Sequence, residues 1–96
     1  MKRDEILHLI GEHKTELREL GVKSLAIFGS VARDEATHAS DVDILVEFEG
    51  PATFDAYMET RFYLEDLLGM RVDLVTRQAL RPRIQPYIIK DLVYVA

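Results

Sequence analysis

The stretch from Ile27 to Phe48, IFGSVARDEATHASDVDILVEF, holds two apolar segments with a polar loop between them. The first segment predicts a strand that ends before Gly29, and the second predicts a strand that begins with Asp41 and Asp43. Because side chains alternate along a strand, both aspartates are expected on one face and the neighbouring apolar residues on the other. Their Cβ atoms would lie roughly 6 to 7 Å apart, so the two carboxylates can converge on one or two divalent cations. This spacing suits a metal site.

The region before this stretch predicts an amphipathic helix from Asp4 to Leu20. Apolar residues recur there with the helical period, and the charged residues lie mostly on the opposite side. Gly21 stands where a left-handed C-terminal cap is wanted, so the helix should end before the first strand, at residues 25–28. Beyond that strand, Ser30 is expected to cap a short helix that runs to about Glu35, and residues 37–40 are expected to form a loop.

The region after the stretch predicts a long helix from Phe54 to Leu68, with Thr53 as its N-cap and Gly69 as its stop. The apolar stripe of this helix is irregular, because Arg61 and Glu65 lie close to its edge. The helix is therefore expected either to be half buried or to face a partner.

A third strand is predicted at residues 71–76, with Asp73 on one side and its apolar neighbours on the other. Pro82 and Pro86 restrict where a final helix can start, and we expect it from about Arg83 to Lys90, followed by an extended segment. The resulting order is helix, strand, short helix, strand, helix, strand, helix. This order indicates an α/β (α+β) fold, in which a small mixed β-sheet carries helices packed on one side.

Length and composition favour a single globular domain over residues 1–96, with ordinary shares of hydrophobic (48%) and charged (30%) residues. No apolar run approaches the ~20 residues that span a bilayer, and the amino terminus does not resemble a signal peptide. We therefore expect a cytoplasmic protein with no membrane partner. The absence of cysteine excludes disulfides, thiolate zinc sites and cysteine nucleophiles. Seventeen acidic against twelve basic residues give a net charge of −5, which opposes binding to long nucleic acid.

Gly29 and Ser30 have the properties of a phosphate-binding turn. Gly29 permits close approach of the backbone, and Ser30 supplies a hydroxyl at the start of a helix whose free N–H groups favour an anion. Taken alone, a Gly-Ser pair is more often an ordinary turn into a capped helix, so this prediction depends on its neighbours. Arg33 lies about one turn further on, where contact with a phosphate and pairing with Asp34 or Glu35 fit the sequence equally well.

Asp41, Asp43 and Asp73 are the candidate metal ligands. Most surface aspartates are simply solvated or cap a loop. The face that carries the first two continues with Leu45, however, and is therefore not a plain polar surface. Three carboxylates that converge without a cation would repel one another, so a structural role explains them poorly if Asp73 reaches the same face.

These residues resemble the signature of nucleotidyltransferases of the DNA polymerase beta superfamily, which is Gly29-Ser30, ten intervening residues and then Asp41-Val42-Asp43. Within that superfamily, three segments are similar to the minimal nucleotidyltransferase (MNT) subgroup. The segments are FGSVAR at 28–33, SDVDILV at 40–46 and LGMRVDLV at 68–75. The similarity covers nearly the whole chain.

The resemblance implies a metal-assisted transfer of a nucleotide. Asp41 and Asp43 would hold two Mg²⁺ ions on the triphosphate of ATP, and Asp73 would take the proton of the attacking hydroxyl or share a metal with it. Such a displacement relies on positioning and charge neutralisation, so a very small protein can catalyse it. The residues that would bind the nucleotide are Gly29, Ser30, Arg33 and Ser40.

The resemblance also implies a partner. MNT proteins are commonly paired with a HEPN-domain ribonuclease toxin and act as its antitoxin by adenylylating a tyrosine on it. The first hypothesis is therefore Mg²⁺-dependent transfer of AMP from ATP to such a toxin. The alternative is a non-catalytic antitoxin that neutralises its partner by binding, and the intact set of acids favours the enzyme. A third hypothesis, modification of a small molecule such as an aminoglycoside, needs a pocket for which so short a chain has little room.

Overall fold

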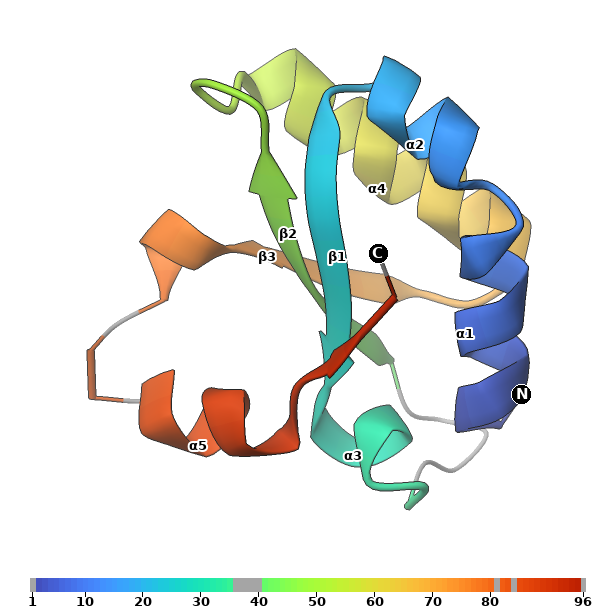
Figure 1. Cartoon of the computed structure of the whole chain (residues 1–96), viewed down its shortest axis with the longest axis vertical. Helices are drawn as coiled ribbons and strands as arrows, with labels where there is room; N and C mark the ends of the chain where they lie inside the picture. Colours follow the sequence, from blue (N-terminus) through green and yellow to red (C-terminus); the bar gives the residue numbers. More distant parts are fainter. Residues whose placement is uncertain (1, 36–40, 81, 84, 96) are drawn as a thin grey trace.

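The structure is a computed structural model, and it describes residues 2–35, 41–80, 82–83 and 85–95 (Figure 1). Its helices and strands follow the predicted order, with a break in the first helix and a short 3₁₀ helix and a fourth strand added towards the end of the chain. The elements are α1 (Arg3–Gly11), α2 (Lys14–Glu19), β1 (Val22–Phe28), α3 (Gly29–Ala32), β2 (Val42–Phe48), α4 (Phe54–Leu68), β3 (Val72–Thr76), η1 (Arg77–Ala79), α5 (Gln85–Asp91) and β4 (Val93–Tyr94).

The four strands form one mixed sheet in the order β3-β2-β1-β4, as the sequence predicts for the sheet type. β1 runs antiparallel to β2 and to β4, whereas β2 and β3 run parallel. Parallel neighbours run in the same direction, and here the register pairs Val42 with Val72. The beginnings of β2 and β3 therefore lie side by side, and both begin next to an acidic residue.

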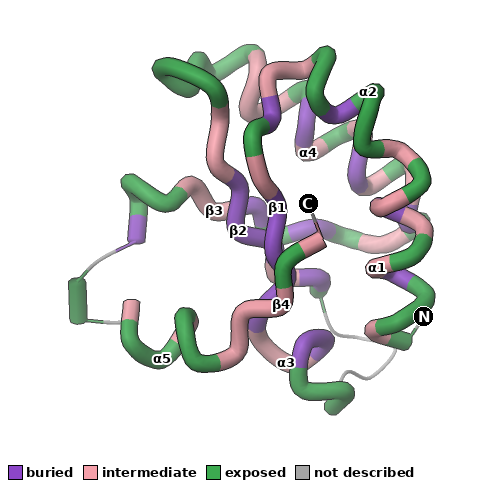
Figure 2. The backbone as a smooth tube through the Cα atoms, viewed as in Figure 1, coloured by how far each residue is buried: buried purple, intermediate pink, exposed green. Residues whose placement is uncertain are grey.

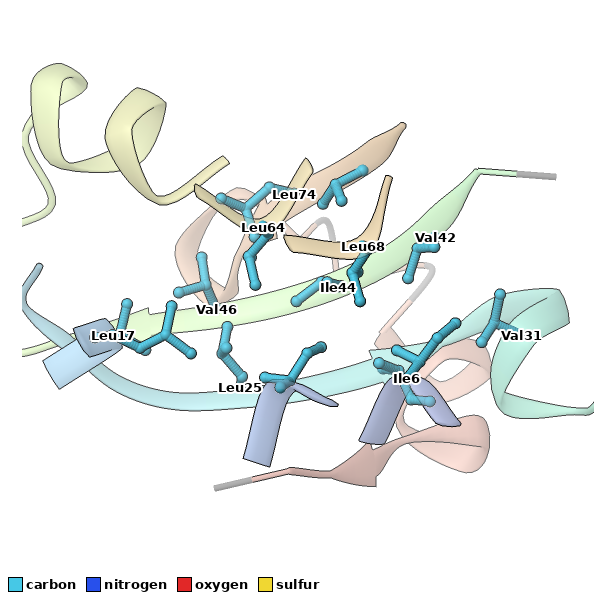
Figure 3. Packing of buried hydrophobic residues seen from close by; sticks show 14 of the residues in the cluster. Ile6, Leu17, Leu25, Val31, Val42, Ile44, Val46, Leu64, Leu68 and Leu74 are labelled. Atoms are coloured by element: carbon cyan, nitrogen blue, oxygen red, sulfur yellow. The ribbon is translucent and has the colours of Figure 1, made fainter. Parts of the chain in front are cut away.

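One face of the sheet is covered by α1, α2 and α4, which lie together on one side of it (Figure 1). Val42, Ile44 and Val46 of β2 are fully buried against this layer, and Figure 3 shows them near Leu64 and Leu68 of α4. The prediction that this side of β2 is the apolar one is confirmed. Each such aliphatic side chain contributes about 1.5 to 3 kcal/mol when fully buried, so this face holds most of the apolar stabilisation.

The opposite face is covered only in part. Figure 2 shows that many of the buried residues lie along the strands. Phe28, Leu45 and Leu80 form a second buried cluster there, and Ile88 and Leu92 pack against it. α5 therefore lies on the side of the sheet away from α1, α2 and α4, which is an exception to the predicted one-sided packing. Burial of Leu45 confirms that the face carrying Asp43 is not a plain polar surface.

The long helix α4 has the predicted bounds because both of its ends are fixed by local signals. The hydroxyl oxygen of Thr53 accepts a hydrogen bond from the N–H of Ala56 at 3.0 Å, which is the contact expected of an N-cap. At the other end Gly69 adopts φ 64°, and its N–H donates to the carbonyl of Glu65. No helix in the described part of the chain is long and apolar enough to cross a membrane.

The prediction of one helix from Asp4 to Leu20 is wrong, because the chain breaks between α1 and α2. The break follows Gly11, a residue with poor helix propensity, and His13 leaves the helical conformation with φ −114° and ψ 25°. The His13 N–H donates to Ile10 O at 2.9 Å, so the broken turn keeps a hydrogen bond. Helical periodicity continues across the break, with Leu17 still buried, so the sequence pattern alone does not reveal it.

The prediction that Ser30 caps a helix reaching Glu35 is also wrong. α3 spans only Gly29–Ala32, its N-cap position is Phe28, and no side chain caps it. The helix starts two residues earlier than expected because Gly29, with φ 73°, turns the chain directly out of β1. The expected loop at residues 37–40 lies outside the described residues.

The tail follows the prediction with a small shift. α5 begins at Gln85 and has Pro86 as its second residue, a position at which proline is tolerated in a helix. The extended segment after it forms β4, in which Tyr94 pairs with Ala26 and Val93 pairs with Ile27. The last strand is thereby attached to the outer side of β1.

Candidate active site

Asp43 and Asp73 are brought together by the parallel pairing of β2 and β3, whose register places the two residues opposite each other. The residues that flank them, at 42, 44, 72 and 74, are all buried on the helix-covered face. Both carboxylates therefore project from the other face of the sheet. This is the arrangement that the alternation of residues in the two strands predicts.

The carboxyl group of Asp43 is in an unfavourable place for a negative charge, and its pKa is raised to about 6. Partial burial is the largest cause, because it removes water from the charged form. The charge of Asp73, a hydrogen bond with Asp73 and the charge of Asp41 raise the pKa further, and the positive charge of Arg33 lowers it. A cation bound at this point would relieve the repulsion between the carboxylates.

Gly29 packs directly against the side chain of Asp43. A Cβ atom at position 29 would lie 3.1 Å from Cγ of Asp43 and would overlap its Oδ2. Gly29 also has φ 73°, a conformation that residues with a Cβ rarely adopt. The end of β1 can therefore approach the carboxylate of Asp43 closely only because residue 29 is glycine. The approach of this turn to a phosphate stays a prediction.

Asp41 lies just before β2 and is exposed, and its carboxylate is paired with Arg71, with Oδ1 3.4 Å from Nε. Within the described residues, no group of three or more histidine, aspartate or glutamate side chains is arranged to hold a metal ion. The structure thus brings two of the three predicted ligands together, while the third lies close enough to affect the pKa of Asp43 but turns to Arg71. The parallel strand pairing explains this contact, because it places the residues before β2 beside those before β3.

The donor set still fits a divalent cation. Carboxylate oxygens are the ligands that Mg²⁺ prefers, and Mg²⁺ is often bound through only one or two carboxylates together with substrate phosphates. Asp43 and Asp73 supply two such groups. Asp41 is held only by an exposed ion pair, a kind of contact worth about 0 to 1 kcal/mol, so it is free to join them.

Arg33 is engaged by two carboxylates in the structure. Its Nη1 donates to Asp91 of α5 at 2.8 Å, and its Nε donates to Glu35 at 3.2 Å. These hydrogen bonds, with Asp91 first, raise the pKa of Arg33. Of the alternatives that the sequence left open for Arg33, the structure shows the pairing with Glu35. The contact with Asp91 was missed because 58 residues separate the two in sequence.

The remaining candidate nucleotide ligands are Ser30 and Ser40. Ser30 is half-buried in α3 and directly follows Gly29, the residue that packs against Asp43. Ser40 lies outside the described residues. A pocket of about 180 Å³ lies at the opposite ends of β2 and β3, where it is bordered by Glu47, Phe48, Thr76 and Arg77, and the acids do not line it.

Chemically, this end of the sheet offers carboxylates for a cation, a glycine turn for the close approach of a phosphate and an exposed acid on an edge strand. Asp43 and Asp73 form an acid pair, in which Asp73 is the more accessible because it is exposed and Asp43 is half-buried. A hydroxyl group that approaches from solvent therefore meets Asp73 first, and a carboxylate so placed is suited to accept a proton.

The chain matches the family model described as a nucleotidyltransferase domain over residues 10–95. It is 45% identical over 93 residues to the protein adenylyltransferase MntA of Thermococcus cleftensis, a match that covers 96% of this chain and 94% of that protein. The fold is similar to a solved structure of a candidate minimal nucleotidyltransferase, with a TM-score of 0.82, 34% identity and coverage of 97% of this chain and 95% of that one. It also shares its fold with a chain from the complex of a tri-AMPylated HEPN toxin of Shewanella oneidensis with an MNT antitoxin, with a TM-score of 0.67, 19% identity and coverage of 94% and 71%.

Proposed function

Because this chain belongs to the nucleotidyltransferase domain family, and within it to the protein adenylyltransferases, we propose that it transfers AMP from ATP to a tyrosine hydroxyl of a HEPN-type toxin and thereby acts as its antitoxin. The observation that carries the proposal is the pairing of Asp43 with Asp73 beside Gly29. A pair of carboxylates in which the pKa of one, here Asp43, is raised is typical of a catalytic site.

Asp41, Asp43 and Asp73 are the residues that would hold magnesium. When bound, two Mg²⁺ ions neutralise the charge of the triphosphate and polarise the phosphorus that is attacked. Asp43 has a fixed place between Gly29 and Asp73, so it sets the position of the site, and Asp41 completes the ligand set on leaving Arg71. Asp73, the most exposed of the pair, also takes the proton of the incoming hydroxyl.

The turn at Gly29 and Ser30 is proposed to bind the outer phosphates. Gly29 has no side chain to keep the phosphates away from Asp43, and Ser30 offers a hydroxyl one residue further on. Arg33 adds a positive charge close enough to lower the pKa of Asp43. Ser40 stays a predicted nucleotide ligand from the resemblance alone.

The acceptor is proposed to be a protein because the acid pair lies on an open end of the sheet. Asp73 sits on an edge strand and is exposed, so a side chain presented by another molecule can reach it. The solved complex of a tri-AMPylated HEPN toxin with an MNT antitoxin, which shares this fold, supports a HEPN toxin as that molecule. A protein with these roles would act in the cytoplasm, beside the toxin that it neutralises.

A non-catalytic antitoxin that acts by binding is the second candidate function. One observation favours it, which is that several large apolar side chains are exposed, among them Phe54 (76%) and Tyr87 (75%). Exposed aromatic residues are common at the centre of protein interfaces. The same surface would also serve an enzyme whose substrate is a protein. The two functions therefore differ only in whether AMP is transferred to the partner.

Incubation with labelled ATP, Mg²⁺ and a HEPN protein encoded next to this chain tests the proposal. Wild type should label the HEPN protein on tyrosine, and Asp43→Asn should not. Asp66→Asn is the matched control, since Asp66 is exposed on α4, which covers the face of the sheet opposite to Asp43 and Asp73, and it should label at the wild-type rate. If this chain binds the HEPN protein tightly and inhibits it while no label appears, the binding function is correct and the transferase function is not.

A further inference from the structure

β3 carries Asp73 and forms one edge of the sheet, with β2 as its neighbour among the strands that the structure describes. The N–H of Val42 donates to Arg71 O at 2.9 Å, and in a parallel ladder alternate residues of one strand bond to the other. The odd-numbered residues of β3 therefore direct their backbone groups to β2. Val72 and Leu74, on either side of Asp73, direct theirs to the open edge.

Two side chains of α4 occupy this open edge. The Tyr57 hydroxyl donates to Leu74 O at 2.5 Å, and the Glu65 carboxylate accepts from the N–H of Val72 at 3.1 Å. Each contact is therefore made with a residue whose backbone groups face outward. Unpaired edge groups leave a strand free to shift or to pair with another chain, so these contacts do for β3 what a further strand would do.

The same contacts explain the irregular stripe of α4. Tyr57, Arg61 and Glu65 are four residues apart and so lie along one side of the helix. Arg61 Nε is 3.8 Å from the carboxylate of Glu65, whose side chain is only 23% exposed. Tyr57 and Glu65 at the edge of an otherwise apolar stripe thus contact β3, and Arg61 lies beside Glu65.

We propose that Tyr57 and Glu65 are positioning residues for the transfer reaction, because they hold β3 so that Asp73 stays against Asp43. The inference rests on the proposed function for the role of Asp73. Asp73 lies between the two residues that α4 holds, so a movement of either moves its carboxylate. A displacement of about 1 Å at a catalytic group can cost about 100-fold in rate.

The first test compares four variants at a temperature where circular dichroism shows all of them folded. Tyr57→Phe and Glu65→Ala should each lower kcat for AMP transfer by about tenfold while KM for ATP changes by less than about twofold. Glu65→Gln should keep most of the activity, because its amide oxygen still accepts from Val72. Glu59→Ala is the control on the exposed side of α4 and should behave as wild type.

Binding of Mn²⁺ without nucleotide, measured from the free-ion EPR signal, is the second test and does not require any transfer activity. Tyr57→Phe and Glu65→Ala should weaken Mn²⁺ binding by about fivefold or more, and Glu65→Gln should restore it. Wild-type Mn²⁺ affinity together with wild-type kcat in Tyr57→Phe and Glu65→Ala would overturn the inference. If no protein, wild type included, transfers AMP, then the proposed function fails and the Mn²⁺ affinities alone decide whether α4 positions Asp73.

Discussion

Asp43 and Glu47 project from the same face of β2, one near each end of the strand, and their surroundings are opposite. Glu47 is neutralised, since its carboxylate lies 3.3 Å from Arg77 and 4.0 Å from Lys23. Asp43 instead faces Asp73 across the parallel register, with Asp41 nearby, and its pKa is raised to about 6. In a folded protein a partly buried acid is usually paired with a base, because a buried charge without a partner is costly. The acids therefore gather at the end of the strand where we propose that a cation binds.

The largest expected effect is a difference in AMP transfer between substitutions at the two ends of this face of the sheet. Asp73→Asn removes a carboxylate from the acid pair and should lower AMP transfer by about 10³-fold, since metal-based charge stabilisation is worth several kcal/mol. Glu47→Gln removes a carboxylate of the same strand face and should change transfer by less than about twofold. Both rates are measured with labelled ATP under saturating Mg²⁺. Equal losses in the two variants would mean that charge on this face matters in general and that the acid pair has no special role.

A second comparison uses two glycines with nearly the same backbone conformation. Gly29 and Gly50 have φ 73° and 74°, but a Cβ at position 29 would meet Asp43, whereas a Cβ at position 50 would meet nothing within 4 Å. Gly29→Ala and Gly50→Ala should therefore both lower the free energy of unfolding by about 1 to 2 kcal/mol, the cost of a left-handed residue with a Cβ. Only Gly29→Ala should also lower transfer, by about tenfold or more, because the carboxylate of Asp43 must turn away. Urea unfolding and the transfer assay measure the two effects separately.

The smallest effect concerns stability and pH. Asp43 binds its proton more tightly in the folded state than in the unfolded chain, so the free energy of unfolding should fall as pH rises from about 4 to about 6. Asp43→Asn removes this loss. After allowance for the partial exposure of the group, the variant should be more stable than wild type by about 1 kcal/mol at pH 7.5 and about equal to it at pH 4.

Urea unfolding of both proteins at the two pH values checks this prediction, and Glu47→Gln serves as the control. Because Glu47 is already paired with Arg77 and Lys23, its substitution should not stabilise the fold at pH 7.5. An Asp43→Asn variant that is less stable than wild type at pH 7.5 would show that the carboxylate is well accommodated without a cation.

The sequence predicts those features that depend on neighbouring residues. α4 has its predicted bounds because Thr53 and Gly69 fix its ends locally, and the placement of Asp43 and Asp73 follows from alternation along two short strands. The match to the nucleotidyltransferase domain family confirms the resemblance that these motifs indicate.

Other features depend on contacts between distant segments and could not be predicted. The ion pairs of Arg33 with Asp91 and of Asp41 with Arg71 need the positions of α5 and β3. The break before Lys14 preserves the apolar period, so periodicity gave no sign of it. The contacts of Tyr57 and Glu65 with β3 could not be predicted without knowing that β3 is an edge strand.

We propose that a divalent cation binds at the acid pair of β2 and β3, and paramagnetic broadening of backbone amide signals by Mn²⁺ tests this most directly. In a spectrum recorded with substoichiometric Mn²⁺, the amides of Gly29, Asp43 and Asp73 should broaden first, and Asp43→Asn should abolish that selectivity. Broadening that begins elsewhere, for example around Glu47, or that is the same in wild type and Asp43→Asn, would contradict the account.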